Sequence, residues 1–273
     1  MGCDASILLN ATDSSNPAEK DAIPNSFLRG YKVIDTIKAN LEKACPSTVS
    51  CADVLALVVR DVVSLVGLLI LVPQVPTGRR DGRVSIMSEA LNMLPGFTAN
   101  ISSLKSQFAA QGLSVKDLVV LSGAHTLGNA HCFTVTNRIY NFSGRGDNTD
   151  TDPALDKTYV PKLRGKCSPL PADAIKPIEM DPGSFLSFDN SYFTLVSKRR
   201  GLFESDAALL DDPETRAYVL RQANAPPTEF FEDFGVSMVN MGNIGVLTGS
   251  QGKSGSSVPS GTRVFTSLPN GKK

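Results

Sequence analysis

Histidine is scarce in this sequence, which has only two among its 273 residues, His125 and His131. Both fall in the stretch LSGAHTLGNAHC, six residues apart. Imidazoles that share a metal ion on one helix usually stand four residues apart, and a separation of six turns a helix through about 600° and puts the rings on different faces. We therefore expect at most one of the two to serve any given site.

The sequence also lacks an excess of either positive or negative charge, and it lacks a long apolar run. The chain has 27 Lys+Arg and 27 Asp+Glu and no long basic block, so no nucleic-acid partner is expected. The longest apolar run, 62–73, is too short to span a bilayer and is predicted to be a helix end that continues into an extended segment. No G-x-S-x-G motif is present, so a catalytic triad is not expected.

The amino terminus leaves alternatives open. MGCDAS matches the pattern for N-myristoylation, with Cys3 available for a second acyl chain, and no secretion signal precedes it. Three glycosylation sequons, at Asn10, Asn100 and Asn141, would matter only in a secreted chain. Five cysteines leave at least one unpaired if the others form disulfides.

Helical patterns dominate, so we predict an all-α fold, either one large domain or two lobes. Ser114 and Asp117 form a capping box, and Gly123 ends the helix that follows it just before His125. His125 is thus expected at a helix end, and His131 as a partly exposed helix residue. The tail 249–273 is rich in Gly, Ser and Lys and is predicted to be disordered or loosely attached. The predicted helices are 29–44, 50–66, 101–110, 116–122, 129–140, 153–163, 190–198, 213–222 and 227–241.

Three oxygen-rich clusters could carry chemistry. The first, 180–190 (MDPGSFLSFDN), supplies carboxylates and hydroxyls, the hard donors that calcium takes in groups of six to eight. The second, 2–6 (GCDAS), has a similar donor set, and the third, 201–206 (GLFESD), has an acid beside apolar residues. Each has a structural alternative, because Asp and Ser commonly cap helices. For His125 the structural alternative is a buried ring with both nitrogens satisfied by neighbours.

The chain resembles the secretory plant-type (class III) haem peroxidases through nine motifs in order. They are GCDASILL (2–9), EKDAIPN (19–25), RGYKVIDTIKANLEKACPSTVSCADVLAL (29–57), GRRDGR (78–83), LSVKDLVVLSGAHTLGNAHC (113–132), RIYNF (138–142), FDNSYF (188–193), GLFESDAAL (201–209) and MGNIGVLTG (241–249). The resemblance implies an all-α haem-peroxidase fold of two helical lobes with haem b between them. It further implies a distal-side lobe at 1–112, incomplete at its amino terminus, and a proximal-side lobe at 113–248, followed by the tail.

The resemblance also assigns roles. His125 would be the axial ligand of the haem iron, and Asp206 would accept its other ring proton, which raises ligand basicity and fixes the tautomer. Asn25 would orient a distal histidine, Pro95 would belong to the substrate mouth, and Cys132 would pair with Cys167 in a disulfide. Two calcium sites are implied, a proximal one at Thr126, Asp181, Ser184, Ser187 and Asp189 and an incomplete distal one at Gly2, Asp4, Ser6 and Glu19. Because the family motif accounts for GCDAS, myristoylation becomes the minor hypothesis.

The sequence departs from the family at its start. In the family the distal Arg and His precede GCDAS, whereas this sequence begins after them, and the expected partners of Cys3, Cys45 and Cys51 are missing. We expect an incomplete copy of a secreted, monomeric glycoprotein of the cell wall or vacuole, active in the plant oxidative stress response. Its activity would be that of a peroxidase that reduces hydrogen peroxide and oxidises small phenolic donors in one-electron steps. The alternatives are a catalytically impaired haem- and calcium-binding remnant and a secreted binding glycoprotein without haem.

Overall fold

The computed structural model describes residues 2–12, 15–67, 74–146 and 149–253. Two sequence predictions fall largely outside these ranges: the extended segment after residue 67 and the low-complexity tail beyond residue 253. Among the described residues, no helix is both long enough and apolar enough to cross a membrane.

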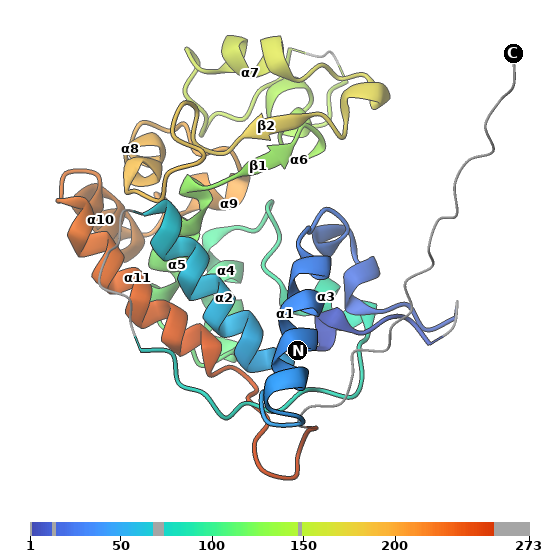
Figure 1. Cartoon of the computed structure of the whole chain (residues 1–273). Helices are drawn as coiled ribbons and strands as arrows, with labels where there is room; N and C mark the ends of the chain where they lie inside the picture. The colour runs from blue at the N-terminus through green and yellow to red at the C-terminus, as the bar shows by residue number, and fades with distance from the viewer. Residues whose placement is uncertain (1, 13–14, 68–73, 147–148, 254–273) are drawn as a thin grey trace, which may run out of the picture. The chain divides into compact units, whose positions relative to one another are not determined.

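The described residues are mainly helical, which confirms the all-α prediction (Figure 1). One small sheet pairs β1 (Asn129–His131) antiparallel with β2 (Pro177–Glu179). The α-helices are α1 (Tyr31–Ala44), α2 (Cys51–Val66), α3 (Met87–Met93), α4 (Ile101–Ala110), α5 (Val115–Ser122), α6 (Phe133–Tyr140), α7 (Val160–Lys166), α8 (Ser191–Ser197), α9 (Glu204–Ala208), α10 (Pro213–Gln222) and α11 (Pro227–Gly242). The 3-10 helices are η1 (Ser6–Leu8), η2 (Glu19–Asp21), η3 (Ile23–Asn25), η4 (Gly123–Thr126) and η5 (Pro171–Asp173).

Helix starts follow the predicted capping signals. The Ser114 hydroxyl accepts a hydrogen bond from the Asp117 N–H at 3.1 Å, and Asp117 Oδ2 accepts one from the Ser114 N–H at 2.9 Å, so the capping box of α5 is confirmed. Helices α10 and α11 each carry proline in their first turn, as predicted. At these positions the local signals agree with where the helices begin.

Two predicted helices are wrong in part. Residues 129–131 form β1 instead of the start of a helix, because β1 pairs with β2 and the N–H groups of Cys132 and Phe133 donate to carbonyls at 176 and 174. His131 therefore lies on a strand. The predicted helix 153–163 begins only at Val160, because Asp156 Oδ1 accepts the Thr158 N–H at 2.9 Å and forms a turn instead.

The described chain divides into two compact units. Unit 1 comprises the described residues of 1–55, 77–92 and 245–273, and unit 2 those of 56–76 and 93–244. The predicted lobes 1–112 and 113–248 are defined by the side of the haem on which they would lie, not by compactness. The two units therefore do not test the boundary between the lobes, which stays a prediction.

In unit 1, the start of α2 is held by carboxylates distant in sequence. Asp81 accepts hydrogen bonds from the N–H groups of Cys51 and Ala52 at 3.0 and 2.9 Å. Buried Asp53 accepts the Gly78 N–H at 2.7 Å and pairs with Arg79 at 3.3 Å. The two bonds to Asp81 satisfy N–H groups that a helix start leaves without a partner, and those of Asp53 attach the helix to the segment at residues 78–79.

Unit 2 contains two apolar clusters. In the first, α5 contacts α4, α10 and α11 (Figure 1), and Leu118, Val119 and Val120 of α5 are buried among the rings of α8 and α11. The second packs the small sheet against α6 and α7, with Val135, Ile139 and others fully buried. Residues 123–128, which connect α5 to β1, link the two clusters.

Candidate functional site

His125 lies in unit 2 on η4, which follows α5 directly. The turn is tightly packed: a Cβ on Gly123 would come within 2.6 Å of the Phe230 ring and 2.9 Å of the Phe193 ring. The His125 side chain is 36% exposed, whereas Asp206, its partner, is 1% exposed. The imidazole thus has a buried side and an open side.

On the buried side, His125 Nδ1 lies 2.8 Å from Asp206 Oδ1. Asp206 belongs to the short helix α9, and its Oδ2 accepts the Phe203 N–H at 2.8 Å. Burial raises the pKa of Asp206, but the charge of His125 and the hydrogen bonds it receives outweigh burial and hold the pKa below its ordinary value. The carboxylate is therefore ionised and can only accept, so Nδ1 of His125 carries the proton.

Aromatic rings fix the plane of the imidazole. The Phe203 ring contacts it edge-on at a centroid distance of 5.1 Å, and the Tyr192 ring does so at 5.9 Å. Nε2 has no hydrogen bond to any described residue. The structural alternative of a buried histidine satisfied at both nitrogens is therefore wrong: Nε2 offers a lone pair on the open side.

Next to His125, an oxygen-rich cluster gathers four of the five side chains assigned to the proximal calcium site. Thr126 Oγ1 lies 3.3 Å from Asp181 Oδ2 and 3.1 Å from Asp189 Oδ1, and Ser184 Oγ lies 2.5 Å from Asp189 Oδ2. The fifth residue, Ser187, is exposed and is linked to the cluster by its backbone N–H, which donates to the Ser184 carbonyl. Asp189 Oδ1 also accepts the Ser191 N–H at 2.8 Å, so the predicted capping role is present as well.

The two carboxylates of this cluster, Asp181 and Asp189, repel each other electrostatically. Burial and the nearby charge of Asp189 raise the pKa of Asp181 to about 6. Within the described part of the chain, no group of three or more His, Cys, Asp or Glu side chains could hold a metal ion. A cation here would therefore rely on hydroxyl and carbonyl oxygens beside two carboxylates, which is calcium chemistry.

In unit 1, the residues assigned to the distal side also lie together. Ser6 Oγ lies 2.7 Å from Asp4 Oδ1 and 2.9 Å from Glu19 Oε1, and a Cβ on Gly2 would clash with the Gly245 carbonyl at 2.5 Å. Burial raises the pKa of Glu19. Asn25 Nδ2 donates to the backbone carbonyl of Glu19 at 2.8 Å, so Asp4, Ser6, Glu19 and Asn25 are joined by hydrogen bonds.

Pro95 is exposed between α3 and α4. Two residues further, the Phe97 carbonyl accepts the Ser205 N–H at 3.0 Å, and the Phe97 ring contacts Phe203 at 6.0 Å. Phe203 also touches His125, so the segment at Pro95 is connected to the imidazole through two aromatic rings.

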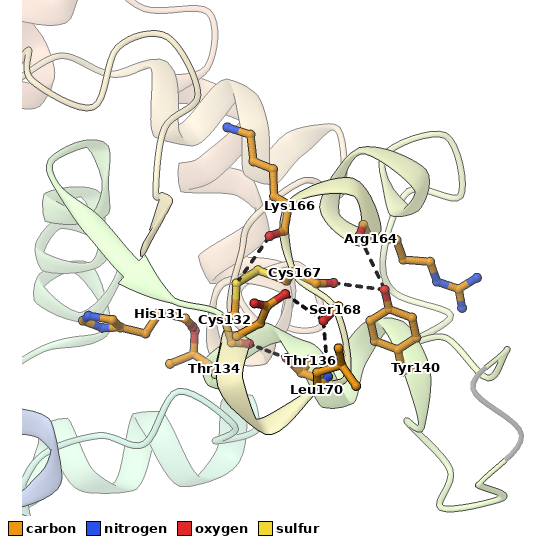
Figure 2. Close-up of a disulfide and its surroundings, with 11 residues drawn as sticks. His131, Cys132, Thr134, Thr136, Tyr140, Arg164, Lys166, Cys167, Ser168 and Leu170 are labelled. Atoms are coloured by element: carbon orange, nitrogen blue, oxygen red, sulfur yellow. Dashed lines mark hydrogen bonds between the residues drawn. A yellow bond between two sulfur atoms is a disulfide. The ribbon is translucent and has the colours of Figure 1, made fainter. Parts of the chain in front are cut away.

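Cys132 and Cys167 form a disulfide that joins the end of β1 to the end of α7 (Figure 2). Tyr140 Oη donates to the Cys167 carbonyl at 3.0 Å and fixes this side of the bridge. His131 points away from the disulfide in Figure 2 and stacks on Phe133 at 6.1 Å. Cys45 and Cys51 carry free thiols.

Sequence reasoning missed Tyr192 and Phe203 as neighbours of His125. Both lie inside quoted motifs, FDNSYF and GLFESDAAL, but an aromatic residue in an apolar segment is usually a core residue. Tyr192 is 2% exposed, and its hydroxyl donates to Asp206 Oδ1 at 2.9 Å. Burial next to that carboxylate raises the pKa of Tyr192 well above its ordinary value, so the phenol is neutral.

An imidazole with an open Nε2 and an Nδ1–H held by a buried carboxylate is the arrangement that proteins use for an axial metal ligand. The sequence profile of the family described as Peroxidase matches residues 1–225. Peroxidase 56 of Arabidopsis thaliana is 57% identical over 252 residues, covering 92% of this chain and 74% of that protein. Peroxidase 1 of Oryza sativa subsp. japonica is 54% identical over 253 residues, covering 92% and 76%.

The chain belongs to the peroxidase family, in its plant secretory (class III) branch. Its activity by family is that of a haem peroxidase, with hydrogen peroxide and an electron donor as substrates. Family membership thus implies haem as the cofactor, and the open imidazole of His125 fits that group.

Proposed function

We propose that His125 is the axial haem ligand and Asp206 its orienting carboxylate, in a peroxidase that oxidises small phenolic donors in one-electron steps. The observation that carries the proposal is the asymmetry of the imidazole: Nδ1 is bound at 2.8 Å to a carboxylate that is 1% exposed, and Nε2 is open. A histidine held in the core for packing alone has both ring nitrogens satisfied by neighbouring groups.

When bound, haem b supplies the redox chemistry: it gives two electrons to peroxide and regains them, one at a time, from two donor molecules. The chain supplies the geometry. Asp206 keeps the proton on Nδ1, so the lone pair of Nε2 is available. The hydrogen bond also polarises the Nδ1–H bond, which raises the basicity of the imidazole as a ligand. The edges of Phe203 and Tyr192 prevent the ring from turning.

We propose calcium for the cluster of Thr126, Asp181, Ser184, Ser187 and Asp189. Two carboxylates lie within 3.3 Å of one threonine hydroxyl, and burial together with the charge of Asp189 raises the pKa of Asp181. Because Thr126 follows His125 and Asp189 precedes α8, a cation here would hold the ligand loop against the helix that carries Tyr192.

On the distal side we propose that Gly2, Asp4, Ser6 and Glu19 form part of a second calcium site and that Asn25 orients a distal histidine. The hydrogen-bonded group Asp4–Ser6–Glu19–Asn25 supports a shared role. We propose Pro95 as part of the substrate mouth, supported by its exposed position and the aromatic link from Phe97 to His125.

We further propose that the protein is a secreted monomer of the cell wall or vacuole, with sugar on its sequons. The Cys132–Cys167 disulfide supports this, because disulfides persist in oxidising compartments.

The test is to reconstitute the full chain with hemin, add hydrogen peroxide and a phenol, and follow oxidation of the phenol against free hemin. We expect oxidation above free hemin, lost in His125→Ala and kept in His131→Ala, the matched control. Hemin binding without phenol oxidation would overturn the proposed activity in favour of the haem- and calcium-binding remnant. Absence of a Soret band would favour the binding glycoprotein without haem.

A further inference from the structure

The carboxylate behind His125 has more donors than the orientation of a histidine requires. Asp206 Oδ1 accepts His125 Nδ1–H at 2.8 Å and also the Tyr192 hydroxyl at 2.9 Å, while Oδ2 accepts the Phe203 N–H. The phenol and the imidazole thus share one oxygen atom, with Asp206 1% exposed and shielded from water.

We propose that Tyr192 is a positioning residue that limits how strongly Asp206 draws the Nδ1 proton from His125, and so sets the electron donation of the imidazole. The inference rests on the proposed role of His125 as the haem ligand. It assigns a tuning role to a residue that packing alone would place in the core.

The physical reason is competition for charge. Each donor that binds a carboxylate stabilises the negative charge on it and leaves less of that charge for the next donor. In a buried site this competition is not relieved by water. With the phenol in place, the carboxylate draws the Nδ1 proton less strongly, and the imidazole donates less electron density through Nε2.

Tyr192 is well fixed for this role. Its ring contacts the His125 ring edge-on at 5.9 Å and the Phe193 ring at 5.2 Å, and the side chain is 2% exposed. Tyr192→Phe would keep these ring contacts and remove one hydrogen-bond donor. The substitution therefore separates the hydrogen bond from the packing.

The test uses the full chain loaded with haem and reduced to the ferrous state. In Tyr192→Phe we expect the iron–histidine stretching frequency in resonance Raman spectra to rise and the reduction potential to fall, because a freed Asp206 makes His125 more anionic. A merely structural role predicts the reverse, since a loosened ring gives a weaker bond, a lower frequency and a higher potential. Either this reverse result or an unchanged frequency would overturn the inference.

Tyr218→Phe is the matched control. Its hydroxyl also donates to a carboxylate, Asp233 Oδ2 at 2.6 Å, in the same unit, but its ring is not among the contacts of His125. We expect frequency and potential to stay at wild-type values. A shift in this control equal to that of Tyr192→Phe would overturn the inference, because any lost phenol would then have the same effect.

A second readout needs no haem. In the haem-free chain, the Nδ1 proton of His125 should move downfield in the NMR spectrum of Tyr192→Phe, because its hydrogen bond to Asp206 strengthens; an upfield move would contradict the inference. An iron–histidine band absent from the wild type would overturn the proposed function and the inference with it. A band that is present but does not respond to Tyr192→Phe overturns the inference alone.

Discussion

Gly123 occupies the point between α5 and η4 where a side chain has the least room. We predict that Gly123→Ala destabilises the fold by about 1–3 kcal/mol, the usual cost of overpacking a filled core. The added Cβ would lie 2.6 Å from Phe230 and 2.9 Å from Phe193, two fully buried rings of the first apolar cluster. Urea unfolding at neutral pH measures the loss.

The matched control is Gly165→Ala in α7, where an added Cβ meets no atom within 4 Å. We expect this variant to be as stable as the wild type or up to about 1 kcal/mol more stable, because alanine favours a helix over glycine. Equal effects of the two substitutions would contradict the packing argument.

Single residues also show what the sequence could and could not predict. His125 and Asp206 were assigned through family motifs, since helical spacing alone favoured a structural histidine. Tyr192 was not assigned, because a buried tyrosine in an apolar stripe looks the same whether or not its hydroxyl has a partner. Its role depends on a contact across 14 residues, to Asp206, which only the fold creates.

At the scale of elements, the capping box of α5 makes stability depend on pH. Burial raises the pKa of Asp117, but hydrogen bonds from Ser114 and Asn240 outweigh burial and lower the pKa. Because the folded pKa lies below the unfolded value, ionised Asp117 stabilises the fold above about pH 4, and this stabilisation is lost as pH falls through the folded pKa.

We therefore predict that Asp117→Asn costs about 1 kcal/mol at pH 7 and progressively less below pH 4. Urea unfolding of both proteins at pH 7 and near pH 3 checks the difference. Asp35→Asn, at an exposed position on α1, is the control and should change little at either pH. A cost for Asp117→Asn that stays constant with pH would contradict the account.

The small sheet explains why the start of the predicted helix 129–140 was wrong. Their apolar spacing fits a helix, but the backbone of 129–131 pairs with β2, which lies almost 50 residues further along the chain. Local periodicity contains no information about such a distant partner, and the pairing of the two strands overrides the local helical preference. The capping box of α5 was predicted correctly because all of its atoms lie within four residues.

The disulfide beside this sheet closes a long loop, since its cysteines are 35 residues apart. We predict that the double variant Cys132→Ala/Cys167→Ala loses about 3–4 kcal/mol of stability, mainly through the added freedom of the unfolded chain. Thermal or urea unfolding measures this loss. Cys45→Ala, which removes a free thiol, is the control; a similar loss in that variant would contradict the role given to the disulfide.

At the scale of the whole molecule, the calcium proposal predicts that chelation lowers stability. Removing calcium from the full chain should lower the free energy of unfolding by about 2–4 kcal/mol relative to saturating calcium. Asp189→Ala should lose most of this response, because Asp189 contacts both Thr126 and Ser184. Asp35→Asn should keep the full response. If chelators leave the melting temperature of the wild type unchanged, the calcium proposal is wrong.

The fold class could be predicted from helical spacing, and the family from nine ordered motifs. The division into two units could not, because unit 1 is assembled from three separate stretches of sequence. Contacts such as that of the Asp81 carboxylate with the N–H of Cys51, 30 residues away, create this division. Composition and local patterns carry no signal for such pairings.

The most direct test of the central claim is a hemin titration of the full chain followed by the Soret band, in the wild type, His125→Ala and His131→Ala. We predict one hemin bound per chain through a histidine in the wild type and in His131→Ala. In His125→Ala that ligation should be lost and restored by added imidazole. Unchanged histidine ligation in His125→Ala would contradict the account, because the ligand would then be another group.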